Sequence, residues 1–441
     1  MDTLGLLSIF VGFSILIFVT YRGWSIYLAS FLGAVATVWL AGLPLTETLT
    51  EQYLGGLGSI VSSLLGMFLF SSVMAKLYAS SGAALSIAYT LQHLFLSRVT
   101  AAAQRRRMSL LLVILASSVI CYGGINAAVV IITIYPIAIS IFKSNNIPLR
   151  FAPGVILSGC VTFALSGPGS PQPTNLIPST LLGTSPTSGL LPGIVGMIVE
   201  IFVTLFVLDK MISRAQARGE QFEPASTACT LPALEKDTPP FFISLLPLAT
   251  LFVLFNLMHL DILFCTLTGA ALSVFLFAPY MARKDIRKCI NTGLSDSLVP
   301  VGSIGAVFGF ASCIQCVPAF QAVIDAVIRW SGPPFLLCIV SVALLCALTG
   351  GSTTGQSIAL PIVAPLLQAQ GMPAAIIHRI AAFSATTLDS LPYSGTILMT
   401  INHAGLKMKD AYPAIFVSTT LATSAASLVV AALLYFLPFL A

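Results

Sequence analysis

Two hydrophobic segments of this chain are interrupted by proline, glycine and small polar residues: residues 166–175 read SGPGSPQPTN, and residues 388–396 read LDSLPYSGT. Hydrocarbon offers no hydrogen bonds to the backbone, so non-helical backbone at membrane depth is tolerated only where protein or a water-filled cavity satisfies it. Paired interruptions in two halves of one chain are typical of transporter binding sites. The two breaks therefore predict one site built from both halves.

The composition fixes the environment of the chain. Its 441 residues are 57% hydrophobic and 8% charged, with a mean hydropathy of +0.99, whereas soluble domains carry about 25% charged residues. This predicts an all-α polytopic membrane protein. Residues 4–20 lack the basic start of a signal peptide, so we expect a retained transmembrane helix. The net charge of +5 comes from basic residues in short loops, so no nucleic-acid partner is expected.

Stretches of roughly 20 apolar residues mark the expected crossings of the bilayer. They are residues 4–20, 25–42, 55–78, 153–182, 187–208, 241–258, 262–280, 297–320, 376–404 and 412–440. With the N-terminus outside, only Arg329 and Arg379 of the 20 Lys and Arg residues face outward. That asymmetry favours ten crossings of a cell inner (plasma) membrane with both termini outside.

Two further apolar stretches, 109–142 and 334–370, are each broken near the middle by a glycine pair. The breaks are residues 123–126 and 350–355. Each half is short for a full crossing, so we expect two re-entrant hairpins. The alternative is one long tilted helix for each stretch, which would reverse the charge bias downstream.

Landmark residues recur in order across the polar stretch 209–240. Pro136 and Pro361 are separated by nearly the same offset as Pro171 and Pro392. We therefore expect a first repeat at 1–208, a cytoplasmic linker at 209–240 and a second repeat at 241–441. Five crossings in each half place the second repeat upside down, as in many secondary transporters. Each repeat then holds one re-entrant hairpin and one broken helix.

Several runs of this sequence resemble the gluconate:proton symporter family, a branch of the ion transporter superfamily. They are residues 123–125, 168–172, 175–178, 182–184, 302–307, 317–321, 349–355, 388–392, 395–406 and 411–413. The PGSPQ run at 168–172 looks more like the branch that includes hydroxybutyrate carriers, and Tyr393-Ser394 replaces the pair, commonly His-Asn, that the family carries there. The resemblance implies a scaffold domain, a moving transport domain and a homodimer.

A broken helix exposes free N–H groups that attract anions and free carbonyls that attract cations. We expect neutral donors at the hairpin tips and breaks to bind a small carboxylate with hydroxyl groups, with no Lys or Arg nearby. The candidates are Asn126, Ser170, Gln172, Thr174, Asn175, Ser352, Thr353, Thr354, Ser390, Tyr393 and Ser394. The alternative for any single residue is a bond to its own helix or to a neighbouring helix.

Two intramembrane acids are candidates for ion coupling. Asp389 lies beside the second break, and a carboxylate at that depth is costly enough to be a functional hypothesis by default. It could carry the coupling proton or bind Na⁺, and the alternative is a helix cap. Glu200 lies mid-span, where a structural contact to Ser or Asn is the alternative. Asp296 is expected to be solvated or capping, and His378 to lie near the outer surface.

These features favour a secondary carrier that imports a small organic anion by H⁺ symport, with Na⁺ coupling as the alternative. A channel would lack inverted halves with paired broken helices. An intramembrane enzyme would need a motif such as HExxH, which the sequence lacks. No ATP-binding loop, cofactor or metal site is expected, and the lipid bilayer and a second copy of the chain are the expected partners.

Overall fold

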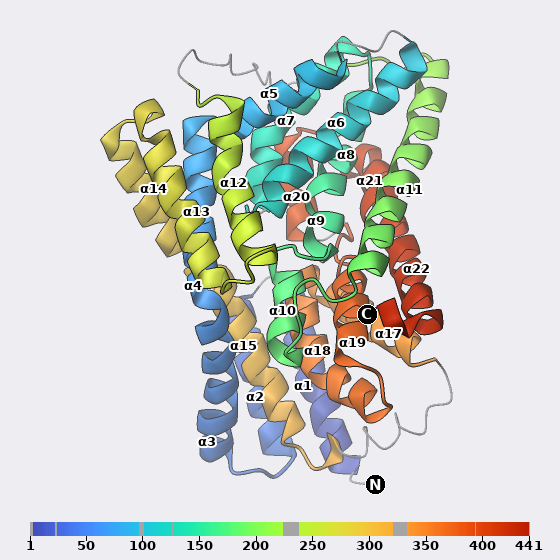
Figure 1. Ribbon diagram of the computed structural model, residues 1–441. Coiled ribbons are helices and arrows are strands. Elements are labelled where there is room, and N and C mark those ends of the chain that lie inside the picture. Colours follow the sequence, from blue (N-terminus) through green and yellow to red (C-terminus); the bar gives the residue numbers. More distant parts are fainter. Residues whose placement is uncertain are drawn as a thin grey trace.

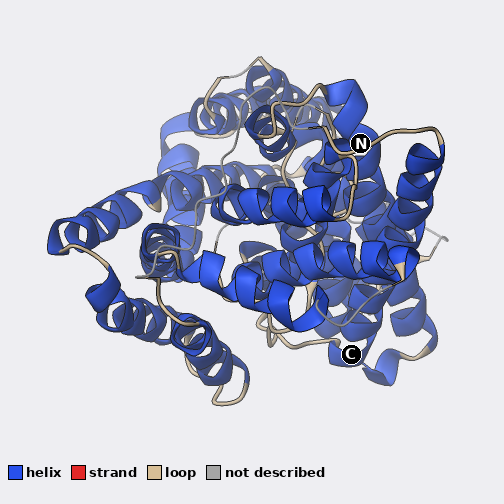
Figure 2. Cartoon of the chain, turned by 90° about the horizontal axis from the view of Figure 1, so that it is seen from above, coloured by secondary structure: helices blue, strands red, loops and turns tan. Residues whose placement is uncertain are grey.

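The structure is a computed structural model that describes residues 3–22, 24–96, 101–125, 127–223, 238–320, 333–392 and 394–440. Within these ranges it consists of helices and loops without any strand (Figures 1 and 2). Six helical stretches among them are long and apolar enough to cross a membrane. The predicted all-α polytopic class is confirmed.

The helices of the N-terminal part are α1 (Thr3–Tyr21), α2 (Ile26–Leu40), α3 (Leu45–Thr48), η1 (Leu49–Tyr53), α4 (Leu54–Ser81), α5 (Ala83–Leu96), α6 (Ala102–Tyr122), α7 (Ala127–Ser144), η2 (Leu149–Phe151), α8 (Ala152–Cys160), α9 (Phe163–Ser166), α10 (Pro173–Leu182) and α11 (Leu190–Ala217). Those of the C-terminal part are α12 (Phe241–Asn256), α13 (Ile262–Phe277), η3 (Ala278–Tyr280), α14 (Arg283–Asp296), α15 (Leu298–Gln315), α17 (Pro334–Thr349), α18 (Ser352–Ala369), α19 (Ala374–Ala385), α20 (Gly395–His403), α21 (Met408–Ile415), η4 (Phe416–Leu421), α22 (Ala422–Phe436) and η5 (Pro438–Leu440).

Two long helical stretches, α4 and α14–α15, lie side by side and run in opposite directions (Figure 1). Glycines allow the close approach: a Cβ on Gly309 would come within 2.4 Å of the Tyr53 carbonyl oxygen, and one on Gly293 within 2.7 Å of Val73 Cα. The α1–α2 pair packs on α15, α13 packs on α4, and α12 packs on α13. These elements form the wall against which the hairpins and broken helices lie, and we call them the scaffold.

Both glycine pairs end a helix. Gly124 and Gly350 adopt left-handed backbone conformations, with φ of +90° and +68°, which other residues rarely adopt. After each pair the chain reverses, because α6 packs on α7 and α17 on α18. A Cβ on Gly355 would lie 2.3 Å from the Cys346 backbone. The alternative of two long continuous helices is wrong.

The proline-rich runs break their helices as predicted. Residues 167–172 separate α9 from α10, and residues 386–394 separate α19 from α20. Pro173 opens α10 at a position where its missing N–H removes no helical bond. The inverted relation of the halves and the depth of the hairpins stay predictions.

The expected linker begins later than the polar composition indicated. Helix α11 continues to Ala217, because buried Asp209 accepts hydrogen bonds from Arg106 at 2.6 Å and Arg107 at 2.7 Å and so holds the end of α11 against α6. Residues 224–237 of that stretch lie outside the described residues.

Candidate functional site

A cavity of about 340 Å³ lies between the scaffold and the interrupted helices. We call it the central cavity. Its scaffold side is formed by α4 and α15, and its other side by α18 and the two breaks. It is lined by Phe68, Ala127, Val161, Leu165, Gln172, Pro173, Pro300, Ser303, Ile304, Gly351, Ser352, Thr353, Thr354, Asp389, Ser390, Ser394 and Thr396.

Four helix N-termini contribute to this lining. Ala127 is the first residue of α7, Pro173 of α10 and Ser352 of α18, while Thr396 is the second residue of α20. The first N–H groups of a helix have no partner inside the helix. No side chain of the N-cap residue caps α10, α18 or α20. Partial positive charge from several helix ends therefore converges on one small space, which favours an anion.

Asp389 is the acidic side chain in the lining. It is 6% exposed, and the Ser390 hydroxyl donates a hydrogen bond to its Oδ1 at 2.8 Å. Ser352, at the tip of the second hairpin, is a further hydrogen-bond partner of this carboxyl group. The carboxyl group thus connects the second break to the second hairpin, directly at the helix N-termini.

Each break is also tied to the hairpin of its own half. Gln172 Nε2 donates to the Cys121 carbonyl at 2.6 Å and to the Ile125 carbonyl at 3.3 Å. Ser394 Oγ donates to the Gly350 carbonyl at 2.8 Å. In both halves a break residue therefore satisfies carbonyl groups at the glycine turn.

The predicted donors divide into two sets. Those in the central cavity are Gln172, Ser352, Thr353, Thr354, Ser390 and Ser394. Ser170, Thr174 and Asn175 are fully buried and do not line the cavity. Their side chains bond to backbone carbonyls of Ala164, Leu165, Ser170 and Pro186, so they shape the first break. Asn126 and Tyr393 lie outside the described residues.

The expectation that no Lys or Arg lies near the breaks is wrong. Arg379, from α19, is fully buried. Its guanidinium donates to the Ser166 carbonyl at 2.7 Å and to Asn175 Oδ1 at 3.1 Å, both in or beside the first break. Further bonds go to the carbonyls of Ser188 and Pro186. Arg379 does not line the central cavity, so it stabilises carbonyl groups behind the site.

His378 is also buried, not near the surface as expected. Its Nε2 lies 3.0 Å from Asn175 Oδ1 and its Nδ1 lies 2.6 Å from the Thr184 hydroxyl oxygen. His378 and Arg379 were both predicted to face the outer side of the membrane. The sequence does not show that α19, which carries them, packs on α10 from the other half of the chain. The signal that was available is the adjacency of two polar residues in an otherwise apolar helix.

Glu200 lies on the buried face of α11 with Gly196 and Thr204. It is 1% exposed, and neither carboxylate oxygen has a hydrogen-bond partner among the described residues. The described part of the chain therefore does not show the structural contact to Ser or Asn that was the alternative for this residue. A buried carboxyl group without a partner is costly in its charged form.

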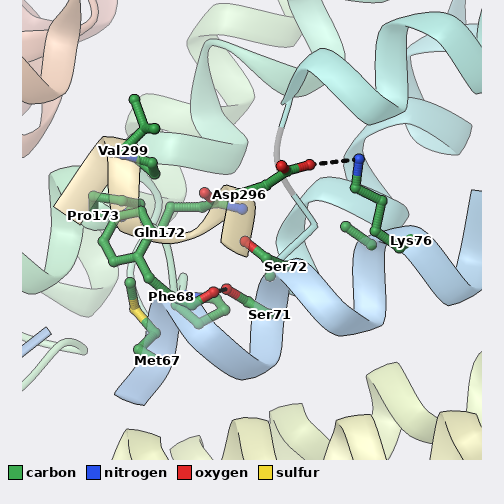
Figure 3. Close-up of a pocket in the computed structure, with 13 residues that line it drawn as sticks. Met67, Phe68, Ser71, Ser72, Lys76, Gln172, Pro173, Asp296 and Val299 are labelled. Carbon is green, nitrogen blue, oxygen red and sulfur yellow. Dashed lines mark hydrogen bonds and ion pairs between the residues drawn. The ribbon is translucent and has the colours of Figure 1, made fainter. Parts of the chain in front are cut away.

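A second cavity, of about 390 Å³, adjoins the central one and shares Phe68, Gln172, Pro173 and Pro300 with it. We call it the middle cavity (Figure 3). Asp296, expected to be solvated or capping, lines it and forms an ion pair of 2.7 Å with Lys76 of α4. Lys76, Phe68 and Pro300 were not predicted as lining residues.

Three His, Cys, Asp or Glu side chains that could hold a metal ion do not come together anywhere in the described part of the chain. The chemistry available at the site is therefore that of helix N-termini, hydroxyl groups, one amide and one carboxyl group. Groups of this kind can hold an anion by hydrogen bonds and helix dipoles without forming covalent bonds.

Comparisons with known proteins agree with this architecture. No protein-family model matches the sequence. The chain is similar to the uncharacterized transporter YxjC of Bacillus subtilis (strain 168), with 25% identity over 475 residues that cover 97% of this chain and 98% of that protein.

Among solved structures, the chain resembles that of the Alcanivorax borkumensis YdaH transporter, described as having an unusual topology. The TM-score is 0.61, with 11% identity, 89% of this chain and 88% of that chain covered. At this identity the likeness concerns the fold. Together with YxjC it places the chain among multi-pass membrane transporters.

Proposed function

We propose that this chain is a secondary carrier that imports a small organic anion such as a sugar acid or a hydroxycarboxylate. The observation that carries the proposal is the convergence of four helix N-termini on the central cavity. Its volume of about 340 Å³ falls at the lower end for small-molecule sites. The hydroxyls of Ser352, Thr353 and Thr354 suit a hydroxylated carboxylate. We assign the chain to the gluconate:proton symporter family, near its hydroxybutyrate-like branch.

Asp389 is the proposed coupling residue. It lies in the cavity that binds the anion, so the presence of substrate bears directly on its protonation. An anion moving into a negative-inside cell needs accompanying positive charge, and H⁺ on Asp389 supplies it. Glu200 is the proposed second proton carrier. Na⁺ at the Asp389 carboxylate is the alternative coupling ion.

The proposed transport cycle is elevator-like. The hairpins and broken helices form the moving part, and the scaffold stays fixed in a homodimer in the inner membrane, with both termini outside. Support comes from the hydrogen bonds that join breaks to hairpins and from the position of the central cavity between these elements and the scaffold.

A ligand screen on the purified protein tests the substrate class. Thermal stability is measured with sugar acids, hydroxybutyrate and glycerate, each with and without Na⁺. A hydroxylated carboxylate should raise the unfolding temperature, whereas its uncharged alcohol should not. Stabilisation of the protein by the anion only when Na⁺ is present would indicate that the coupling ion is Na⁺ and not H⁺. Saturable uptake that depends on a gradient separates the carrier from a channel, and chemical conversion of the anion would reveal an enzyme.

Coupling is tested with Asp389→Asn, which keeps the size of the side chain but cannot release a proton. In proteoliposomes, uphill uptake driven by a pH gradient should be lost, while exchange of labelled for unlabelled anion should persist. Glu200→Gln, at the other buried acid, should weaken the dependence on the gradient and leave binding intact. Unchanged uphill uptake in Asp389→Asn would remove Asp389 from the coupling mechanism.

A further inference from the structure

Three cavities follow one another through the protein. The central and middle cavities share four lining residues, as described above. A third cavity, of about 420 Å³, lies beside α14 and shares Lys76 and Asp296 with the middle cavity. We call it the α14 cavity. The ion pair of Lys76 and Asp296 therefore stands at the boundary between the second and third cavities.

One face of α4 lines all three cavities in turn. Phe68 lines the central and middle cavities, Ser72 the middle cavity, Lys76 the middle and α14 cavities, and Ser80 the α14 cavity. Residues four apart lie on the same side of a helix. At 1.5 Å per residue, the stretch from Phe68 to Ser80 is about 18 Å long.

The neighbouring stretch α14–α15, which packs beside α4 on the same side of the cavities, shows the same succession in the reverse direction. Ser303 of α15 lines the central cavity, Pro300 the central and middle cavities, Asp296 the middle and α14 cavities, and Thr292 the α14 cavity. The two antiparallel stretches of the scaffold thus lie next to each other and form one side of a path through the three cavities. The 2.7 Å ion pair of Lys76 and Asp296 joins the two stretches at the boundary between the middle and α14 cavities (Figure 3).

An anion that leaves the central cavity along this path meets its first cationic side chain at Lys76. The described lining of the central cavity holds no Lys or Arg, and Lys76 is the cation in that of the middle cavity. The α14 cavity adds Lys288 beside Asp285. Arg379 is occupied by carbonyl and amide oxygens away from the path. A carboxylate on this path would compete with Asp296 for the Lys76 ammonium.

We propose that the Lys76–Asp296 ion pair is a gate on the path to the central cavity, opened when the substrate carboxylate replaces Asp296 on Lys76. Lys76 is thus a second, transient binding subsite for the anion. This rests on the proposed transport of an organic anion. The basic residues Arg283, Lys284, Arg287 and Lys288 on α14 predict that the gate faces the cytoplasm.

The partial exposure of the pair suits this role. The Lys76 side chain is 39% exposed and that of Asp296 58%, and ion pairs of this kind contribute little to stability because water competes for both charges. A gate must open often, and a weak contact is easily exchanged for another carboxylate. The Lys76 ammonium keeps an anionic partner in either state.

The experiment measures how fast a thiol in the central cavity reacts from the α14 side. Ser303→Cys serves as the reporter in a full-length protein whose Cys229, Cys289 and Cys316 are replaced by Ser. Vesicles with the α14 side outward are treated with two membrane-impermeant methanethiosulfonates, one bearing a sulfonate and one a trimethylammonium group. The mean of the two reaction rates reports how open the path is. The ratio of the sulfonate rate to the trimethylammonium rate reports the charge of the groups along the path.

Lys76→Gln and Asp296→Asn should both raise the mean rate about two- to fivefold, the range expected from losing an exposed ion pair. Their effects on the sulfonate-to-trimethylammonium ratio should be opposite: about fivefold lower without the Lys76 charge and about fivefold higher without the Asp296 charge. The double variant Lys76→Asp/Asp296→Lys restores a pair and should return the mean rate to the parental value. Lys284→Gln, an exposed charge on α14 outside the cavities, should change neither quantity.

Mean rates that stay parental in both single variants, or a charge-swapped variant that reacts as fast as they do, would overturn the gate. Ratios that do not move in opposite directions would overturn the anion subsite. The labelling needs no substrate. If no anion stabilises the protein in the ligand screen, the proposed function fails. The labelling rates would still show whether the Lys76–Asp296 pair limits access to the central cavity.

Discussion

At the scale of single residues, Arg379 is the most consequential side chain behind the site. It is fully buried, and its recorded partners are carbonyl and amide oxygens, without a carboxylate among them. Four such oxygens accept its hydrogen bonds: those of Ser166, Ser188 and Pro186 on the backbone, and Asn175 Oδ1. The planar guanidinium can satisfy several diverging acceptors at once, which a lysine ammonium cannot do at these positions. Arg379 therefore holds together the backbone of the first break from the opposite half of the chain.

We expect Arg379→Lys to destabilise the protein by about 2–4 kcal/mol, because hydrogen bonds to a charged donor are lost and buried carbonyl groups lose their partner. Thermal unfolding of the purified protein without ligand measures the effect. Arg287→Lys, an exposed position on α14, is the matched control and should leave the unfolding temperature unchanged. Equal stability of the two variants would mean that water replaces the guanidinium at the break.

The contrast between Asp389 and Arg379 shows how far single residues can be interpreted from the sequence. Asp389 was predicted because its own neighbours, Leu388 and the Pro392 break, mark it as an acid at membrane depth. Arg379 was misplaced because its partners come from residues 166–188, in the other half. Asn175 was predicted as a donor to substrate, but its amide oxygen is taken by Arg379 and His378. Local context reveals which residues are unusual, whereas their partners depend on packing between distant segments.

At the scale of elements, the breaks and the hairpins support each other. The first hairpin turn presents carbonyl oxygens of Cys121 and Ile125, which Gln172 Nε2 satisfies. The second presents that of Gly350, which Ser394 Oγ satisfies. Turn carbonyls buried without a partner would be costly. The helix N-termini that line the central cavity are therefore held in place by bonds between elements.

These two side-chain contacts should differ in strength. Gln172→Ala removes an amide that reaches two carbonyl oxygens and should cost about 1–3 kcal/mol, while Ser394→Ala removes one hydroxyl bond and should cost about 0.5–1.5 kcal/mol. Thermal unfolding without ligand separates the effect on folding from any effect on binding. Ser62→Ala, which loses only a bond to its own helix, should be silent. A larger loss from Ser394→Ala than from Gln172→Ala would contradict this view of the turns.

Element boundaries followed from the sequence where glycine and proline determine them. The pairs at 123–124 and 350–351 and the runs at 166–175 and 388–396 all interrupt helices at the predicted places. The end of α11 was misjudged because polar residues 209–217 were taken as a linker. Their polarity has another cause: Asp209 pairs with Arg106 and Arg107 across α6. Composition alone does not distinguish a solvated loop from a helix end whose buried acid pairs with arginines of a neighbouring helix.

At the scale of the whole molecule, the structure separates into the scaffold and the part formed by hairpins and broken helices. Among the described residues, side-chain bonds cross between them: Asn256 Nδ2 donates to the Gly169 carbonyl at 3.1 Å, and Gln315 Nε2 donates to the Pro361 carbonyl at 2.5 Å. The Pro361 carbonyl needs an outside donor, because the residue four positions later in α18 is Pro365, which has no N–H. An elevator-like movement would have to break both bonds.

The double variant Asn256→Ala/Gln315→Ala should therefore favour movement of the two parts, since each lost bond removes about 0.5–1.5 kcal/mol from this arrangement. Spin labels on exposed Ser62 in α4 and Ser185 beside the first break report the distance between the parts by electron–electron resonance. We expect the double variant to populate a second distance that is minor in the parent. A label pair on Ser62 and Lys284, both in the scaffold, should keep one distance. The contradicting outcome is a single Ser62–Ser185 distance in the double variant, measured with the anion and its coupling ion added. The two parts would then not move relative to each other. A carrier mechanism would have to work through gates such as the Lys76–Asp296 pair alone.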